Sequence, residues 1–171
     1  MAEIRTARFL MRSPTLLDAE AVTTIVNDPR IYEMVGRIPP AQSVEQTGKW
    51  ILNAERGRAL DTDHVYFVIE GSEIIGTVAA HRPATDQPFE LGYWVAPSAW
   101  GRGVATEAAQ ALIDWLNIRG QASLLTSGYF ADNPASGRVL EKLGFTYTRT
   151  ATVFCLGRDM EIEHIFVERK P

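Results

Sequence analysis

The sequence predicts an α/β fold in which a mixed, mostly antiparallel central sheet carries helices on both faces. Two observations predict it. Short β-type runs follow one another from residue 64 to residue 95, and a strand, a glycine turn and a helix then occupy residues 89–120, as in a crossover near the middle of a sheet. Because 171 residues are close to the size at which one domain buries most of its apolar surface, we expect residues 1–171 to form a single domain.

The amino-terminal part of the chain predicts a strand followed by a helix. Residues 4–12 alternate apolar and polar side chains, which indicates a strand that Pro14 closes. Thr15 and Asp18 have the spacing of a helix cap, and the helix is expected to end before Asn27. Its apolar stripe would consist of Leu17, Ala21 and Ile25, with Val22 beside them.

A second helix follows a less regular segment. Residues 30–42 hold a Pro-Pro pair and predict a short helical turn and a loop. Ser43 and Gln46 then have capping-box spacing, and the helix is expected to end near Arg56, before Gly57. Its apolar face would carry Val44, Thr47, Ile51 and Leu52.

The rest of the chain predicts strands with two helices inserted between them. Residues 64–70 and 73–80 would form a hairpin around Gly71 and Ser72. The further elements expected are a strand at 89–95 closed by Pro97, a helix from 104 stopped by Gly120, a strand at 122–127, a helix between Asn133 and Gly144, and strands at 145–154 and 160–167.

Composition and charge exclude several classes of protein. With 46% hydrophobic and 22% charged residues the chain is an ordinary globular one, which argues against disorder and coiled coil. A formal net charge of −4 is the wrong sign for a general nucleic-acid binder, and no segment approaches the roughly 20 apolar residues that cross a bilayer. One cysteine and an amino terminus without a continuous apolar run favour a cytoplasmic protein.

The turn between the strand at 89–95 and the following helix is the first candidate binding site. Gly101 and Gly103 lie where unpaired backbone N–H groups and the positive end of the helix dipole converge, so an anion fits there, with Arg102 adding charge. The alternative is a pair of glycines that only turns the chain. A Walker lysine and Rossmann glycine spacing are both missing, which makes ATP and NAD poor candidates.

Two motifs identify a family that the chain resembles. Trp100-Gly101-Arg102-Gly103-Val104-Ala105 resembles motif A of the GNAT N-acetyltransferase superfamily, in the aromatic form usual among ribosomal-protein alanine N-acetyltransferases. A second family motif follows, with Asn133, Ser136, Val139, Lys142, Gly144 and Phe145 at the expected spacing. The resemblance spans nearly the whole chain.

The resemblance implies a binding site for acetyl-CoA, and the spacing of the histidines gives no reason to expect a metal. Backbone amides from Gly101 to Thr106 would hold the pyrophosphate, and the strand end at Trp94 and Val95 would pair with the pantetheine arm. The residues expected to contact the cofactor are Trp94, Val95, Trp100, Gly101, Arg102, Gly103, Val104, Ala105, Thr106, Asn133, Ser136, Arg138 and Lys142. For Asn133 the alternative is pure helix capping, and for Arg138 and Lys142 it is exposure to solvent.

Acetyl transfer to an amine needs an oxyanion site, a proton for the departing thiolate and a neutral amine. By the resemblance, a backbone N–H near Val95 would stabilise the oxyanion and Ser136 would donate the proton. Glu90 shares a strand face with Gly92 and Trp94, opposite Phe89, Leu91 and Tyr93, so it is the candidate base; the alternative is a solvated glutamate.

Other residues could take part or could be structural. Cys155 has apolar neighbours and is a core residue or, less simply, an acetyl-accepting nucleophile. His64, His81 and His164 lack the spacing of a zinc site, although His64 or His164 could be a second base. Trp50, Tyr32 and Trp94 could line the acceptor pocket or belong to the core.

The sequence therefore predicts an N-acetyltransferase, and the branch favours a protein or peptide amino terminus as acceptor. A homodimer is expected only from the family. Acetylation of a small amine, such as an aminoglycoside or polyamine, stays open because Asp61, Asp63 and Asp86 lie in loops expected beside the cleft. A non-catalytic module that binds acyl-CoA is the third alternative.

Overall fold

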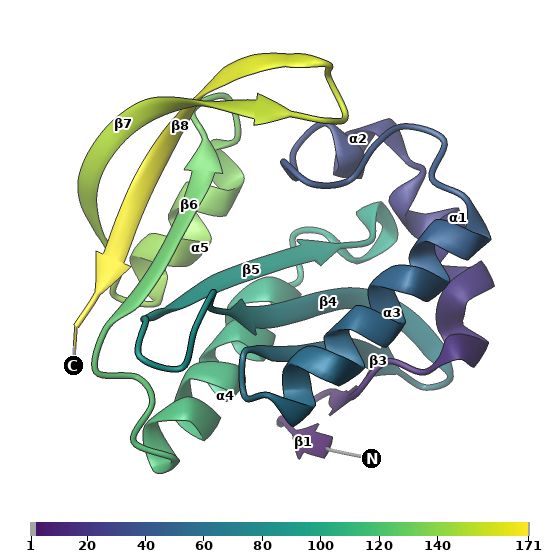
Figure 1. The fold of residues 1–171 in the computed structure, drawn as a ribbon, viewed down its shortest axis with the longest axis horizontal. Helices are drawn as coiled ribbons and strands as arrows, with labels where there is room; N and C mark the ends of the chain where they lie inside the picture. Colours follow the sequence, from purple (N-terminus) through teal and green to yellow (C-terminus); the bar gives the residue numbers. More distant parts are fainter. Residues whose placement is uncertain (1–2, 171) are drawn as a thin grey trace.

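The computed structural model describes residues 3–170, so residues 1, 2 and 171 of the predicted domain lie outside the described residues. Within that range the strands form one sheet in the order β1-β2-β3-β4-β5-β6-β8-β7 (Figure 1). They are β1 (Glu3–Arg5), β2 (Leu10–Arg12), β3 (Asp63–Glu70), β4 (Glu73–His81), β5 (Phe89–Val95), β6 (Leu125–Phe130), β7 (Thr146–Cys155) and β8 (Met160–Arg169). Neighbouring strands are antiparallel except β5 and β6, which confirms the predicted mixed sheet.

Helices cover both faces of this sheet, as predicted. They are α1 (Ala19–Val26), α2 (Pro29–Tyr32), α3 (Val44–Ala59), α4 (Val104–Ile118) and α5 (Pro134–Lys142), with short 3-10 turns at Leu16–Asp18 and Pro97–Ala99. Tyr66 packs in the core cluster that contains the α4 and α5 side chains, whereas its neighbour Phe67 packs with residues of α1 and α2. Since successive strand residues point to opposite faces, the sheet has one apolar core on each side.

The crossover β5–α4–β6 creates a gap in the sheet. The parallel pair β5 and β6 is in register only at Phe89 opposite Leu125 and at Glu90 opposite Thr126. Beyond this point the two strands diverge, as Figure 1 shows, and the Ser127 hydroxyl donates to the Leu91 carbonyl at 2.7 Å. The last residues of β5 therefore have no neighbouring strand on the β6 side.

Local signals in the sequence located several element ends correctly. Ser43 and Gln46 form the predicted capping box, with Ser43 N–H donating to Gln46 Oε1 at 2.7 Å and Gln46 N–H to Ser43 Oγ at 3.1 Å. The hairpin β3–β4 turns at Gly71, whose φ is +61°. Asn133 caps α5 by accepting from Ser136 N–H at 3.3 Å.

The predicted first strand is wrong as a single element. The chain turns at Thr6–Phe9, where Thr6 N–H donates to Phe9 O at 3.0 Å and Phe9 N–H donates to Thr6 Oγ1 at 2.9 Å. Glu107 of α4 holds this turn by accepting from Thr6 Oγ1 at 2.6 Å. The segment therefore folds into the hairpin β1–β2 because of a partner about a hundred residues away.

Three further expectations need correction. The stripe predicted for the first helix is only partly correct: Val22 is buried and Ile25 packs against a core cluster, but Leu17 is 94% exposed and Ala21 is exposed as well. The buried side chains of α1 are Ala19, Val22, Thr23 and Val26. α3 continues to Ala59, since Gly57 does not stop it but packs against Asp63. β6 begins three residues later than predicted and runs through Gly128, where a side chain would collide with His164.

Candidate active site

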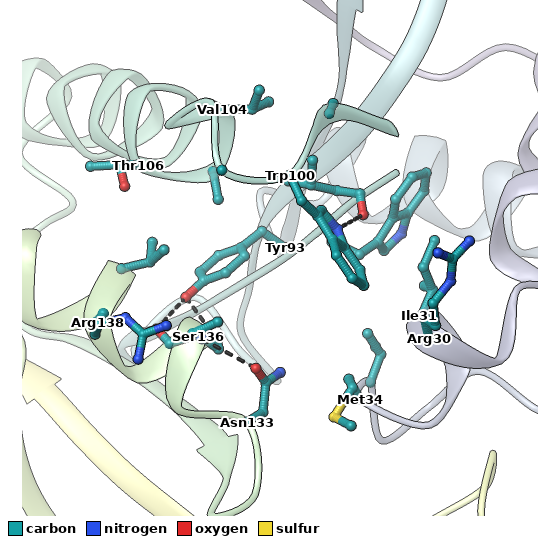
Figure 2. Close-up of a pocket in the computed structure, with 18 of the residues that line it drawn as sticks. Arg30, Ile31, Met34, Tyr93, Trp100, Val104, Thr106, Asn133, Ser136 and Arg138 are labelled. Atoms are coloured by element: carbon teal, nitrogen blue, oxygen red, sulfur yellow. Dashed lines mark hydrogen bonds between the residues drawn. The ribbon is translucent and has the colours of Figure 1, made fainter. Parts of the chain in front are cut away.

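A cavity of about 730 Å³ lies where β5 and β6 diverge. Figure 2 shows it between the start of α4, the start of α5 and the α2 segment. Its lining consists of Arg30, Ile31, Glu33, Met34, Val35, Tyr93, Trp94, Val95, Ala99, Trp100, Gly101, Gly103, Val104, Ala105, Thr106, Asp132, Asn133, Pro134, Ala135, Ser136, Arg138, Val139 and Lys142.

The amino terminus of α4 is one wall of this cavity. Gly103 takes the N-cap position with φ +74°, and no side chain caps the helix. The first N–H groups of an α-helix have no partner inside the helix, so those of Val104, Ala105 and Thr106 are available to an anion. Gly101 also has positive φ, +73°, and a Cβ on it would meet nothing within 4 Å, so a ligand can approach its backbone.

The end of β5 presents to the cavity a peptide group that does not pair with β4. Val95 lies opposite Gly76 in β4, and Ala96 N–H donates to Ile75 O at 2.9 Å, which marks Val95 and Gly76 as a non-hydrogen-bonded pair. The N–H and C=O of Val95 therefore point away from β4, toward the gap. The Trp100 indole N–H donates to the Val95 carbonyl at 2.7 Å, and the Val95 N–H is left as the donor predicted for an oxyanion.

Tyr93 and Ser136 form a hydrogen-bonded pair in the centre of the cavity (Figure 2). The Tyr93 hydroxyl lies 2.9 Å from Ser136 Oγ and donates to the Ser136 carbonyl at 3.0 Å. Burial raises the pKa of Tyr93 to about 12, so the phenol stays protonated at neutral pH. Tyr93 was missed as a site residue, although its predicted position opposite Glu90 on β5 is correct.

The structure brings most of the predicted cofactor residues to one cavity. The predicted residues that line it are Trp94, Val95, Trp100, Gly101, Gly103, Val104, Ala105, Thr106, Asn133, Ser136, Arg138 and Lys142. Arg102 does not, because its side chain turns outward and pairs with Glu70 at 2.5 Å while its carbonyl accepts from Arg8 at 2.9 Å. Asn133 both caps α5 and faces the cavity, so its two expected roles do not exclude each other.

Glu90 lies outside the cavity lining. It shares a face of β5 with Trp94, as predicted, but it is exposed and pairs in register with His81 near the opposite end of the strand. At about 3.3 Å per residue, the five positions between Glu90 and Val95 correspond to roughly 16 Å. A direct contact of Glu90 with a group held at Val95 is therefore excluded.

The wall opposite α4 was not predicted. It consists of Arg30 and Ile31 of α2 and of Glu33, Met34 and Val35 in the loop that follows. The irregular segment 30–42 gave no periodic signal, and its place in the cavity depends on contacts with residues beyond 130. The Pro-rich loop alone could not have revealed it.

The aspartates expected beside the cleft are elsewhere. Asp61, Asp63 and Asp86 do not line the cavity. Asp61 accepts from His64 Nε2 at 3.0 Å and from Gln121 at 2.6 Å, and it pairs with Arg82. Asp63 pairs with His81 at 2.6 Å. These groups lie where β3 starts and β4 ends, at the far end of β5 from the cavity.

The remaining candidates have structural surroundings. Cys155 is fully buried and its thiol lies 3.6 Å from the Glu33 carbonyl. Trp50 packs against Phe67 with ring centroids 6.0 Å apart, and neither Trp50 nor Tyr32 lines the cavity. His164 contacts Phe166 with ring centroids 4.5 Å apart. Among residues 3–170, no group of three or more His, Cys, Asp or Glu side chains is placed to hold a metal ion, and no helix is long and apolar enough to span a membrane.

The family of the chain follows from a match to a family model. The model described as the acetyltransferase (GNAT) domain matches residues 8–146, which include the gap, the α4 terminus and Ser136. The chain belongs to the GNAT acetyltransferase family. The predicted family and the predicted class of enzyme, an N-acetyltransferase, are thereby confirmed.

Relatives and a solved structure agree with this assignment. The GNAT chain is 28% identical over 148 residues to the uncharacterized N-acetyltransferase YoaA of Bacillus subtilis, covering 83% of this chain and 81% of the relative. It is 29% identical over 109 residues to the ribosomal-protein-serine acetyltransferase of Escherichia coli, covering 61% and 59%. RimL, the ribosomal L7/L12 alpha-N-protein acetyltransferase, in complex with coenzyme A, superposes with a TM-score of 0.87 at 18% identity over 99% and 98% of the chains, which shows the shared fold.

Proposed function

We propose that this GNAT enzyme transfers the acetyl group of acetyl-CoA to the α-amine of a protein or peptide amino terminus. One observation carries the proposal: the free Val95 peptide N–H, the uncapped α4 terminus and the Ser136 hydroxyl all face one cavity. The first two suit the oxyanion and the phosphates of the donor, and the third suits its leaving thiolate.

The residues present fit acetyl-CoA. Bound acetyl-CoA supplies an activated thioester and a good leaving group. Gly101 and Gly103 admit a pyrophosphate against the backbone amides of Val104 to Thr106, and Arg138 and Lys142 offer positive charge at the same cavity. The open edge of β5 offers hydrogen-bonding groups to the amides of the pantetheine arm.

Each chemical requirement of the transfer then has a candidate group. As the amine attacks the acetyl carbonyl, the Val95 N–H stabilises the negative oxygen. When the carbon–sulfur bond breaks, the Ser136 hydroxyl gives its proton to the thiolate, whose reference pKa is about 8.5. Ser136 is in turn hydrogen-bonded to Tyr93, whose raised pKa keeps the phenol from ionising, and the proton that the amine nitrogen loses on forming the amide would return to this pair by way of solvent.

An α-amine suits this site better than a lysine or a polyamine. Its reference pKa of about 7.7–8.0 leaves part of it neutral at neutral pH, whereas a lysine side chain at about 10.4 needs a strong base. Glu90, the candidate base, lies too far away for direct proton transfer, so any role it has acts through water. Of the two carboxylates that line the cavity, Glu33 and Asp132, the second is paired with Arg158. Little negative charge is left for a polycation.

The test is acetyl-CoA-dependent thiol release with three sets of acceptors at neutral pH. They are peptides with free Ser, Ala or Met amino termini, lysine peptides with blocked termini, and polyamines with aminoglycosides. Turnover on the first set is expected. Turnover on the third set alone would shift the function to small amines, and stabilisation by acetyl-CoA without any turnover would favour the non-catalytic module.

A further inference from the structure

The turn between β7 and β8 packs closely against the loop that follows α2, which lies more than a hundred residues earlier in the chain. Leu156 N–H donates to the Gly36 carbonyl at 3.1 Å. Gly157 packs so closely that a Cβ on it would lie 2.1 Å from the Tyr32 carbonyl oxygen. This contact leaves room only for glycine, so the turn and the loop are fitted to each other.

Arg158 extends this contact to three residues of the cavity lining. Its Nε donates to the Glu33 carbonyl at 2.6 Å, and Nη2 lies 3.2 Å from the Met34 sulfur. Nη1 and Nη2 donate to the two carboxylate oxygens of Asp132 at 2.5 and 3.1 Å. One guanidinium thus joins the loop after α2 to the segment that leads into α5.

The Arg158 guanidinium is largely shielded from solvent, whereas its carboxylate partner is not. The Arg158 side chain is 15% exposed, and its guanidinium lies 5.4 Å from the Phe130 ring centroid. The hydrogen bond from Arg158 holds the pKa of Asp132 below its ordinary value, but the Asp132 side chain is 54% exposed, so solvent screens the pair. The contact therefore fixes the position of the cavity wall through its hydrogen bonds to Glu33 and Asp132.

We propose that Arg158 is a positioning residue that fixes the width of the acceptor end of the cavity, an inference that rests on the proposed function. The donor would occupy the α4 and α5 side, which leaves the side of Ile31, Glu33 and Met34 for the acceptor. Arg158 holds the backbone of Glu33 there, and it does so with a planar fork that lysine cannot reproduce. Its loss lets the wall move relative to Val95 and Ser136.

The experiment measures steady-state kinetics of Arg158→Gln, Arg158→Lys and Asp132→Asn with the best acceptor peptide. Arg158→Gln is expected to raise the acceptor KM about tenfold and to lower kcat/KM at least as much, because a displacement of about 1 Å from the productive geometry can cost up to a hundredfold in rate. Arg158→Lys should not restore it. Asp132→Asn keeps the bond to the Glu33 carbonyl and should raise KM only about threefold. The Kd of acetyl-CoA should stay within twofold in all three.

Arg12→Gln is the matched control, because Arg12 also holds a carboxylate with two hydrogen bonds, 2.8 and 2.6 Å from Asp18, away from the cavity. It should lower Tm without changing the acceptor KM. An unchanged KM in Arg158→Gln, or an equal loss of acetyl-CoA binding, would overturn the proposal.

Hydrogen exchange decides the same question without turnover. The Leu156 amide donates to the Gly36 carbonyl across this contact, and the Glu33 and Met34 amides donate to the Pro29 and Ile31 carbonyls in the segment that Arg158 holds. All three should exchange faster in Arg158→Gln than in the natural chain. If no amine is acetylated, the proposed function fails on its own, while unchanged exchange at these amides would still reject the role of Arg158.

Discussion

The two ends of β5 show how similar polar groups produce opposite results. At the amino-terminal end, β5 is paired on both sides, and the neighbouring charges satisfy one another: Asp61 with His64 and Arg82, and Asp63 with His81. At the carboxyl-terminal end, β6 has moved away, and the Val95 peptide faces a cavity. The first end is closed by its hydrogen bonds, and the second is open to a ligand.

The difference teaches where to look for chemistry in this sheet. Aspartate and histidine side chains are common in active sites, but at the amino-terminal end of β5 they form ion pairs and hydrogen bonds with one another and with Arg82. At the carboxyl-terminal end of β5 the groups that face the cavity are mainly backbone amides and the hydroxyls of Tyr93 and Ser136. Amino-acid composition gives no sign of such groups. Charged residue types alone are therefore a poor guide here, and the interruption of strand pairing is a good one.

The largest expected effect tests the chemistry at the open end. Ser136→Ala and Tyr93→Phe should each lower kcat about 100-fold, because both remove part of the proton path to the thiolate. The double variant should lose little more than either single one, since hydrogen-bonded groups act as a unit. The measurement is thiol release at saturating acetyl-CoA and acceptor.

Tyr147→Phe is the control for this pair, because Tyr147 on β7 is exposed, its hydroxyl lies 3.4 Å from Thr150 Oγ1, and it does not line the active-site cavity. Its kcat should not change. A Ser136→Ala enzyme with full kcat would show that water protonates the thiolate, and the proposed role of Ser136 would have to be given up.

The second effect tests the closed end. Asp61→Asn should lower the free energy of unfolding by about 2 kcal/mol, because the buried Arg82 loses its carboxylate partner. Asn is a suitable replacement since Asp61 has φ +59°, a conformation that Asn tolerates. Urea unfolding measures the loss. Acetyl-CoA affinity should stay within twofold, and a larger change would mean that the two ends are coupled.

Asp63→Asn provides the comparison for this variant. Its partner His81 has a side chain 41% exposed, so the screened pair should contribute less than about 1 kcal/mol. Equal losses for Asp61→Asn and Asp63→Asn would contradict the view that the burial of Arg82 sets the difference.

The sequence predicted what neighbouring residues determine. Ser43 with Gln46, Asn133 at its cap and Gly71 in its turn all act within four residues, and their elements appear where expected. The wall at residues 33–35 depends on Arg158, 125 positions beyond Glu33, and no local pattern contains that information. The strand predicted at 122–127 stops short of Gly128, where His164 occupies the space that a side chain would need.

The site was likewise predicted where neighbouring residues determine it, and missed where it depends on contacts between distant residues. The motifs located the helix termini, because Gly101, Gly103 and Asn133 act through local backbone geometry. The partner of Ser136 was missed, since the Tyr93 contact joins residues 43 positions apart. Arg102 was misjudged because its direction depends on Glu70 in another strand.

The third effect compares the glycines at the two ends of α4. Gly103→Ala and Gly120→Ala each place a Cβ on a residue with positive φ, +74° and +68°, and each should cost about 1–2 kcal/mol of stability. Gly103 lines the cavity, so only its substitution should also weaken acetyl-CoA binding, about tenfold or 1.4 kcal/mol. Calorimetric titration measures this. Equal affinities in both variants would exclude the α4 terminus as the phosphate site.

The smallest effect is a pH dependence of stability at the closed end. Burial lowers the pKa of His64, whose Nδ1 has no hydrogen-bond partner among the described residues. The folded protein therefore binds fewer protons than the unfolded chain once the pH falls below about 6.5, so stability drops as the pH decreases from there. The slope due to one such group is at most about 1.4 kcal/mol per pH unit.

Burial shifts the pKa of His164 in the same direction, so Tm between pH 7 and pH 5 should be followed in His64→Gln and His164→Gln separately. His64→Gln should flatten the curve without changing acetyl-CoA affinity at pH 7. If Tm of His64→Gln fell as steeply with pH as Tm of the natural chain, the proton uptake would belong to another group, and His64 would not be the source of the pH dependence.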